Sequence, residues 1–210
     1  MTIYEEISAM LQKGRAKNVA ALVEQALAEK CPPEEILNEA LISGMNIIGT
    51  KFQNNEVFVP EVLVAARAMN AGMKTLKPAL NAEGVEPVGK CVICTVKGDM
   101  HDIGKNLVKM MIEGNGIECI DLGVDVDPEK IVEAVKENGA QLVCLSALLT
   151  TTMNGQKDVV DALKAAGIRD QVKVMVGGAP VTQQFADEIG ADCYTLDAAS
   201  AAQAARAFFA

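Results

Sequence analysis

The sequence is poor in aromatic residues and in histidine. Aromatic side chains make up 3% of the 210 residues, tryptophan is absent, and there is one histidine, His101. Half of the residues are nevertheless hydrophobic, so the chain can bury a substantial core. Apolar residues that are mostly aliphatic favour helices packed on one another or on a parallel sheet, and disfavour an aromatic-rich β-sandwich.

Long apolar runs and an excess of basic residues are absent as well. No run approaches the roughly 20 apolar residues that cross a bilayer. The first ten residues, MTIYEEISAM, lack the basic and apolar regions of a signal peptide. The net charge of −9 disfavours binding to nucleic acid or to anionic membrane surfaces. We therefore predict a soluble cytoplasmic protein with no nucleic-acid and no membrane partner.

The six cysteines do not form a convincing metal or redox motif. Cys91 and Cys94, in "CVIC", have the C-x-x-C spacing, but they lie in a predicted strand, where residues three apart point to opposite faces. No second cysteine pair has the spacing of a zinc site. Five of the six cysteines lie in or beside apolar, strand-like runs, so we predict buried, reduced thiols.

The composition changes near residues 81–90, NAEGVEPVGK. Before this segment, apolar residues at helical spacing form four stripes, interrupted by Pro32-Pro33 and by the loop NNEVF. Pro33 and Pro60 are each placed to open a helix. Residues 1–86 are therefore predicted to form a four-helix bundle.

After this segment, five strands alternate with helices. The strands are predicted at 90–96, 118–122, 141–147, 172–177 and 192–196, and the helices at 103–115, 127–138, 152–166, 181–189 and 198–209. Several strands are almost entirely apolar, which is typical of a parallel sheet covered on both faces. Residues 87–210 are therefore predicted to be a doubly wound, five-stranded α/β domain with the flavodoxin-like order 2-1-3-4-5.

A ligand in such a sheet binds outside the carboxyl ends of the strands, between strands one and three. Strand one ends at KGDMHDIG, strand three at SALLTTT, strand four at GGAP and strand five at YTLD. Small residues let a ligand approach the backbone, and hydroxyls can bind it. A turn at Gly177-Gly178 and a helix cap at Thr150–Thr152 are the ordinary explanations. The convergence of these segments with His101 favours a binding site.

His101 is accompanied by Asp99, two residues earlier. A single histidine in a loop is most often a solvated side chain. A metal-bound imidazole, however, usually donates its other N–H to a carboxylate, and Asp99 could accept it. One histidine and one aspartate cannot hold bare zinc, which needs three or four protein ligands. The pair is better suited to an axial ligand of a metal that a macrocycle already holds.

Three motifs resemble those of base-off, His-on cobalamin-binding proteins. "DMHDIG" matches Asp-x-His-x-x-Gly, "SAL" at Ser146–Leu148 matches Ser-x-Leu, and Gly177-Gly178 matches Gly-Gly. The preceding bundle resembles the helical cap of methyl-carrying corrinoid proteins, including the cobalamin module of methionine synthase. Over essentially its whole length the chain is similar to the small corrinoid proteins of methylamine, glycine betaine, methanol and methoxyarene methyltransferase systems.

The resemblance implies a role for each matched residue. His101 would be the lower axial ligand to cobalt, Asp99 would hydrogen-bond its other ring nitrogen, and Thr152 would stand where methionine synthase has a relay serine. Phe58, Val62 and Met69 of the cap would shield the upper face of cobalt. The residues implied to contact cobalamin are Gly98, Asp99, Met100, His101, Asp102, Ile103, Gly104, Ser146, Leu148, Thr150, Gly177, Gly178, Tyr194 and Phe58.

The function implied by the resemblance is methyl carriage on a corrinoid, with methylcobalamin as the loaded cofactor. A substrate-specific methyltransferase would load Co(I), a second methyltransferase would deliver the methyl group to tetrahydrofolate or coenzyme M, and a reductive activase would maintain the cofactor. The chain would then be one component of an enzyme system. Two alternatives stay open: the small subunit of an adenosylcobalamin mutase, which would not need the cap, and a non-catalytic cobalamin store.

Overall fold

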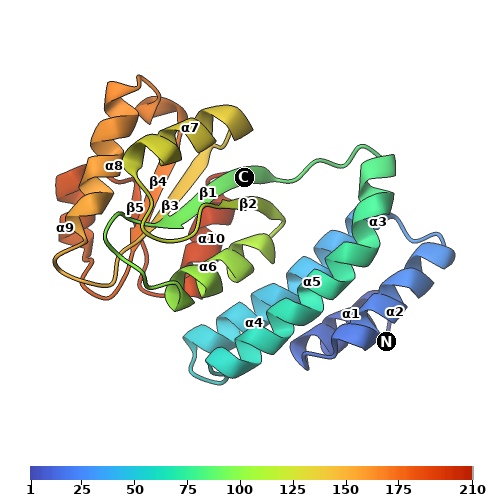
Figure 1. Ribbon diagram of the computed structural model, residues 1–210. Helices are drawn as coiled ribbons and strands as arrows, with labels where there is room; N and C mark the ends of the chain where they lie inside the picture. Colours follow the sequence, from blue (N-terminus) through green and yellow to red (C-terminus); the bar gives the residue numbers. More distant parts are fainter. Residues whose placement is uncertain (210) are drawn as a thin grey trace. The chain divides into compact units, whose positions relative to one another are not determined.

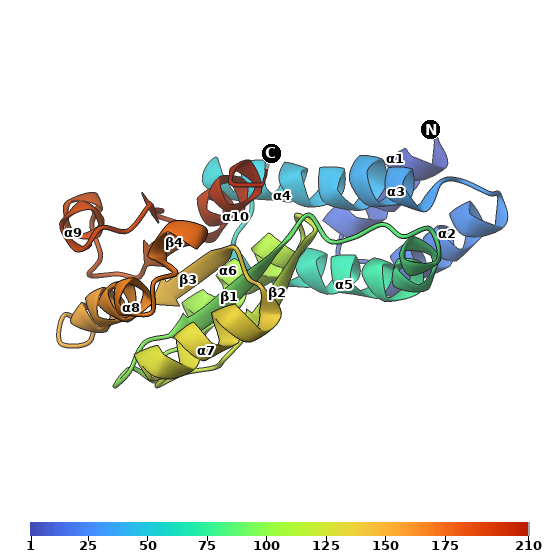
Figure 2. The same ribbon diagram turned by 90° about the horizontal axis from the view of Figure 1, so that it is seen from above.

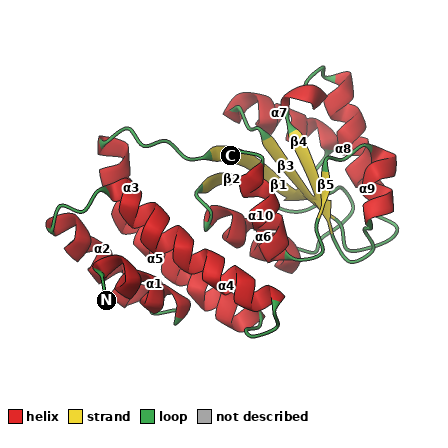
Figure 3. Cartoon of the chain, turned by 180° about the vertical axis from the view of Figure 1, so that it is seen from behind, coloured by secondary structure: helices red, strands yellow, loops and turns green. Residues whose placement is uncertain are grey.

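The computed structural model describes residues 1–209 and divides into two compact units (Figure 1). One comprises Met1–Pro87 with Gly114–Gly116, and the other comprises Val88–Glu113 with the residues from Ile117 onward. The first is built of helices, whereas all the strands of the described chain lie in the second (Figure 3).

The first unit is the predicted four-helix bundle. Pro33–Glu35, Ile36–Ile42 and Ser43–Gln53 follow one another without a break, so they form one helical rod whose middle section is π-helical. The segments are α1 (Ile3–Gln12), α2 (Ala16–Ala28), α3 (Pro33–Glu35), η1 (Ile36–Ile42), α4 (Ser43–Gln53) and α5 (Val59–Ala82). The sequence stripes did not predict the π-helical section, because its apolar residues also fit an α-helical period.

Local signals explain where these helices begin. The Thr2 hydroxyl accepts a hydrogen bond from the Glu5 amide, and the Glu5 carboxylate accepts one from the Thr2 amide, which forms a capping box at α1. Pro33 and Pro60 lie in the first turns of α3 and α5, where a missing N–H does no harm. The apolar stripes then form the buried core, which includes Ile7, Leu11, Val19, Val23, Leu41, Met45, Ile48, Val62, Met69 and Leu76.

Gly72 lets α5 approach its neighbours closely. A β-carbon at this position would lie 2.8 Å from Leu41 Cδ2 and 2.9 Å from Val19 Cγ1. Both distances are shorter than normal van der Waals contacts, so a side chain here would push α5 away from α2 and η1.

The second unit contains a parallel sheet of five strands in the predicted order, β2-β1-β3-β4-β5. The strands are β1 (Gly89–Thr95), β2 (Ile117–Asp121), β3 (Leu142–Ser146), β4 (Lys173–Gly177) and β5 (Cys193–Tyr194). β5 has two residues where the prediction gave five, because it pairs only through Cys193 and Tyr194, and Leu196 beyond them is 85% exposed.

Helices cover both faces of the sheet. They are α6 (Ile103–Glu113), α7 (Pro128–Asn138), α8 (Asn154–Ala165), α9 (Gln183–Ile189) and α10 (Ala198–Ala207), with a short 3-10 turn, η2, at Arg169–Gln171. α7 and α8 lie on one side of the sheet and α10 on the other (Figure 2). α10 packs on α6, and side chains of α7, α8 and α9 share one buried cluster with the sheet. The doubly wound architecture is therefore confirmed.

The cysteines follow the prediction in part. Cys91, Cys94 and Cys144 are buried, whereas Cys31, Cys119 and Cys193 are half-buried, and all six are free thiols. Cys94 joins the cluster under α7 and α8, while Cys91 Sγ lies 3.4 Å from Cys144 Sγ outside that cluster. Burial raises the pKa of the Cys91 and Cys94 thiols, which keeps them protonated and unreactive.

The described residues contain neither a membrane-spanning helix nor a cluster of metal-binding side chains. No helix there has the length and apolarity needed to span a membrane. No group of three or more histidine, cysteine, aspartate or glutamate side chains there could hold a metal ion.

Replacement of Gly72 by alanine tests the close packing of the bundle. We expect Gly72→Ala to lower the free energy of unfolding by about 1–3 kcal/mol, because the added methyl overpacks the contact with Leu41 and Val19. Asn70→Ala, at an exposed position of the same helix, should cause no loss, since alanine is the better helix former. Equal stability of the two variants in urea denaturation would contradict the packing argument.

Candidate functional site

The ends of three strands lie in one row at the carboxyl edge of the sheet. Thr95 of β1 pairs with Ser146 of β3, and Ser146 pairs with Gly177 of β4. Because the strands are parallel, the chain leaves all three at the same edge. The structure thereby brings together His101, the threonine run and the glycine pair, which lie far apart in the sequence.

Neighbouring segments hold the loop that carries His101. The buried Thr95 hydroxyl donates a 2.8 Å hydrogen bond to the His101 carbonyl. Asp125, in the loop after β2, accepts the Gly98 amide at 2.8 Å and donates its own amide to the Asp99 carbonyl at 3.0 Å. Gly98 itself has φ +80°, a conformation that favours glycine. The backbone around His101 is therefore fixed from two sides.

Asp99 is the centre of the hydrogen-bond network. Its side chain is fully buried. Oδ1 accepts the His101 amide at 3.0 Å and lies 2.7 Å from His101 Nδ1. Oδ2 accepts the Leu148 amide at 2.8 Å and the Thr152 hydroxyl at 2.6 Å. One carboxylate thus links the loops after β1 and β3.

The same network keeps Asp99 ionised. Burial alone would raise its pKa, but hydrogen bonds from Thr152, the Leu148 amide and His101 outweigh burial and hold the pKa well below its usual range. An ionised Oδ1 can only accept, so Nδ1 of His101 carries the proton of that hydrogen bond. In the neutral ring, Nε2 is then the nitrogen with a free lone pair, as a metal ligand requires.

The imidazole stands at an exposed, apolar part of the edge. The His101 side chain is 51% exposed although its backbone and Nδ1 are fixed. The exposed apolar residues here are Met100, Leu148 and Leu149 of the same loops and Ile103 at the start of α6. An oriented imidazole among exposed apolar side chains is unusual for a solvated loop and indicates a binding surface.

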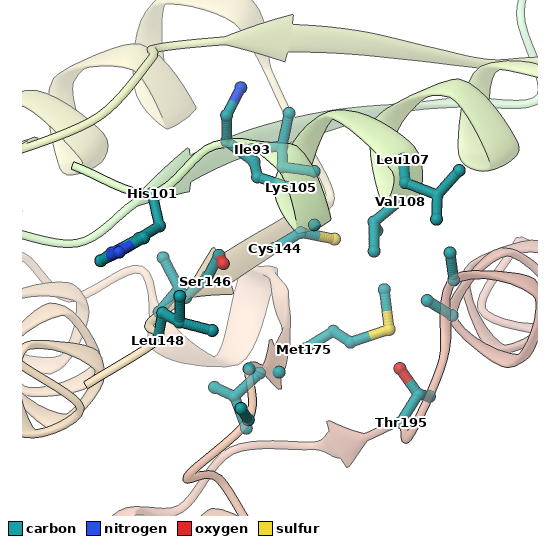
Figure 4. Close-up of a pocket in the computed structure, with 18 of the residues that line it drawn as sticks. Ile93, His101, Lys105, Leu107, Val108, Cys144, Ser146, Leu148, Met175 and Thr195 are labelled. Carbon is teal, nitrogen blue, oxygen red and sulfur yellow. The ribbon is translucent and has the colours of Figure 1, made fainter. Parts of the chain in front are cut away.

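A cavity of about 610 Å³ opens beside His101, a size typical of cofactor sites. Figure 4 shows His101 at one end, with Ser146 and Leu148 next to it. Val108 of α6 and Met175 of β4 lie toward the other end. The cavity therefore runs from the imidazole, across the sheet edge, along the face that α6 and α10 cover.

Glycines allow the close approach of backbone segments along this cavity. Gly178 has φ +128°, and a β-carbon there would lie 1.7 Å from the Ala147 carbonyl oxygen, so only glycine fits. Gly104, by contrast, has no atom within 4 Å of its missing β-carbon. Contacts among the described residues therefore do not require glycine at position 104, and it borders open space in the cavity wall.

Most of the predicted site residues line the cavity, and the others lie behind it, outside its lining or in the helical unit. Those that line the cavity are Met100, His101, Asp102, Ile103, Gly104, Ser146, Leu148, Gly177, Gly178 and Tyr194. Asp99 and Thr152 lie behind His101 in the network, Gly98 lies in the turn before Asp99, and Thr150 is exposed outside the cavity lining. Phe58 belongs to the helical unit, where it is 63% exposed at the start of α5.

Two cap residues are buried, and one site residue makes an additional contact. Val62 and Met69 are buried in the bundle core, so packing accounts for their apolar side chains. Leu148 contributes its backbone amide to Asp99 in addition to its position in the cavity wall.

Thr95 and Asp125 were missed by the sequence prediction. A threonine inside the apolar run CVICTV was the one available signal for Thr95. Nothing in the sequence distinguished Asp125 from other loop aspartates, because its role depends on its position beside Gly98 and Asp99.

Known proteins were compared with the whole chain. Residues 89–206 match the model of the B12 binding domain, and residues 3–77 match a second B12 binding domain model. The chain is 44% identical over 204 residues to dimethylamine corrinoid protein 3 of Methanosarcina acetivorans, a match that covers 97% of this chain and 95% of that protein. The chain belongs to the corrinoid protein family.

Two further relatives extend the comparison. This corrinoid protein is 45% identical over 190 residues to trimethylamine corrinoid protein 1 of Methanosarcina acetivorans, covering 90% of this chain and 88% of that one. It also matches the crystal structure of the methanol:cobalamin methyltransferase complex of Methanosarcina barkeri with a TM-score of 0.87 and 30% identity, covering 99% of this chain and 79% of that one.

Replacement of Thr152 by valine removes the hydroxyl and keeps the shape of the side chain. We expect Thr152→Val to lower the free energy of unfolding by about 1–3 kcal/mol, because the buried carboxylate of Asp99 loses a hydrogen-bond donor. Thr151→Val is the control, since Thr151 is exposed and the hydrogen bond to Asp99 comes from Thr152. Denaturant unfolding of the protein without corrinoid measures both, and a Thr152→Val protein as stable as the control would contradict the role of this hydroxyl.

Proposed function

We propose that this protein is a methyl carrier that holds cobalamin in the base-off, His-on state and serves two methyltransferases. The observation that carries the proposal is the buried Asp99, which orients an exposed His101 beside a cavity of about 610 Å³. Neither a solvated loop histidine nor a core histidine needs this arrangement.

The residues fit the cofactor by their chemistry. His101 Nε2 would bind cobalt from below, while Asp99 keeps the proton on Nδ1 and fixes the ring plane. Thr152 and the Leu148 amide keep Asp99 in place and ionised. The exposed side chains of Met100 and Ile103 would contact the apolar parts of the corrin ring.

The cavity fits the nucleotide tail that His101 would displace. Its inner wall is formed by apolar side chains, among them Ile93, Val108 and Met175, which suits an aromatic base. Gly177 and Gly178 border it without side chains, so the tail could run close to the backbone of β4.

Bound cobalamin supplies the chemistry, since its cobalt accepts a methyl group from one partner and gives it to another. The protein's residues bind and orient the cofactor. Phe58 of the helical unit is proposed to shield the methyl group, because its ring is exposed although such side chains are usually buried.

The names of the relatives support the choice of partners. The relatives named for dimethylamine and trimethylamine are of similar identity to this chain, which supports a methylated amine as the methyl donor. The methanol:cobalamin methyltransferase complex supports a separate methyltransferase that loads the corrinoid. A second methyltransferase, to tetrahydrofolate or coenzyme M, and a reductive activase complete the proposed system.

Removal of the imidazole tests the axial ligand. We expect His101→Ala to fold normally, because half of this side chain is exposed, and to change the visible spectrum of bound cobalamin to that of a cofactor without imidazole. Added free imidazole should restore the wild-type spectrum. Asp158→Asn, at an exposed position of α8 outside the cavity lining, serves as the control, and a His101→Ala spectrum identical to wild type would refute axial ligation.

Methyl transfer tests the carrier role. The reduced cobalamin form of the protein is mixed with purified methyltransferases for monomethylamine, dimethylamine, trimethylamine, glycine betaine, methanol and a methoxyarene, and methylation is followed by absorbance. We expect rapid methylation with an enzyme specific for a methylated amine, followed by demethylation with a second methyltransferase. Stable cobalamin binding without transfer in any combination would instead identify a cobalamin store.

A further inference from the structure

Gln156 lies at the start of α8, fully buried and close to the site. Its Nε2 donates 3.0 Å hydrogen bonds to the carbonyl of Leu145 in β3 and to the carbonyl of Gly177 in β4. Leu145 directly precedes Ser146, and Gly177 is the first glycine of the pair. One side-chain amide therefore connects the ends of both strands that border the cavity.

The same part of the chain also supports His101. Thr152, which binds Asp99, lies in the turn four residues before Gln156. The segment from Thr152 to Gln156 thus contacts the network behind the imidazole at one end and the β3 and β4 ends at the other. Gln156 is absent from the cavity lining, so any effect on a ligand must pass through the strand ends.

Stability alone does not account for a glutamine at this position. Its Oε1 is buried and has no hydrogen-bond partner among the described residues, which lowers stability. The Gly177 carbonyl also accepts the Ala147 amide at 3.2 Å, so it would stay paired without Gln156. An apolar side chain of equal length would avoid the unpaired oxygen.

We infer that Gln156 is a positioning residue that fixes the ends of β3 and β4 for the nucleotide tail of the corrinoid. Its two hydrogen bonds fix the Leu145 and Gly177 carbonyls, which lie next to Ser146 and Gly178 at the edge that borders the cavity. The inference rests on the proposed function. It gives this amide an indirect effect on binding of the tail, through the strand ends, and no effect on contact with the corrin ring.

The test compares two corrinoids that differ in the tail. Gln156→Met keeps the length of the side chain and removes both donors. Dissociation constants for cobalamin and for cobinamide, which lacks the nucleotide tail, are measured by absorbance titration of wild type and variant. We expect cobalamin to bind at least about tenfold more weakly to the variant, cobinamide to bind equally to both proteins, and the Tm to stay at or above the wild-type value.

Val159→Ala is the matched control, because Val159 is buried in the same helix and its side chain has no hydrogen-bond donor for the two carbonyls. It should lower the Tm and leave the ratio of the two dissociation constants unchanged. Equal weakening for both corrinoids, unchanged cobalamin affinity, or unfolding of Gln156→Met would overturn the role of Gln156. A wild-type protein that does not bind cobalamin would overturn the proposed function itself.

Discussion

The site depends on one buried carboxylate. Removing a charge from water is unfavourable unless hydrogen bonds replace the lost hydration, and Asp99 receives them from His101, Leu148 and Thr152. Charge-assisted bonds of this kind are short and strong. They tie the loop after β1 to the loop after β3 and fix the His101 ring, so the carboxylate serves folding and orientation together.

The sheet makes this network possible. Parallel pairing aligns Thr95, Ser146 and Gly177, and the strand order brings the loops after β1, β3 and β4 to one edge. The loop that carries Asp99 therefore lies next to the loop that carries its donors Leu148 and Thr152, and short side chains are enough to connect them. The cavity then follows from the absence of side chains at the glycines and from the apolar residues of α6 and β4.

Different residues of the chain stabilise the fold and form the site. The buried residues of the bundle and of the sheet supply stability, whereas the exposed residues of the carboxyl edge present the imidazole and an apolar surface. Relatives named for dimethylamine and trimethylamine are of similar identity to this chain.

The sequence by itself determined the helical bundle and the parallel strands, because apolar periodicity and the positions of proline and glycine are local properties of the chain. The strand order followed from the few topologies that alternating strands and helices allow. It also identified Asp99, His101 and the glycine pair through their motifs. Only the tertiary structure decided that the Leu148 amide binds Asp99, that Thr95 and Asp125 hold the loop, and that Gln156 connects β3 to β4. These contacts depend on strand register and on backbone groups that every residue carries, so no pattern of side chains in the sequence predicts them.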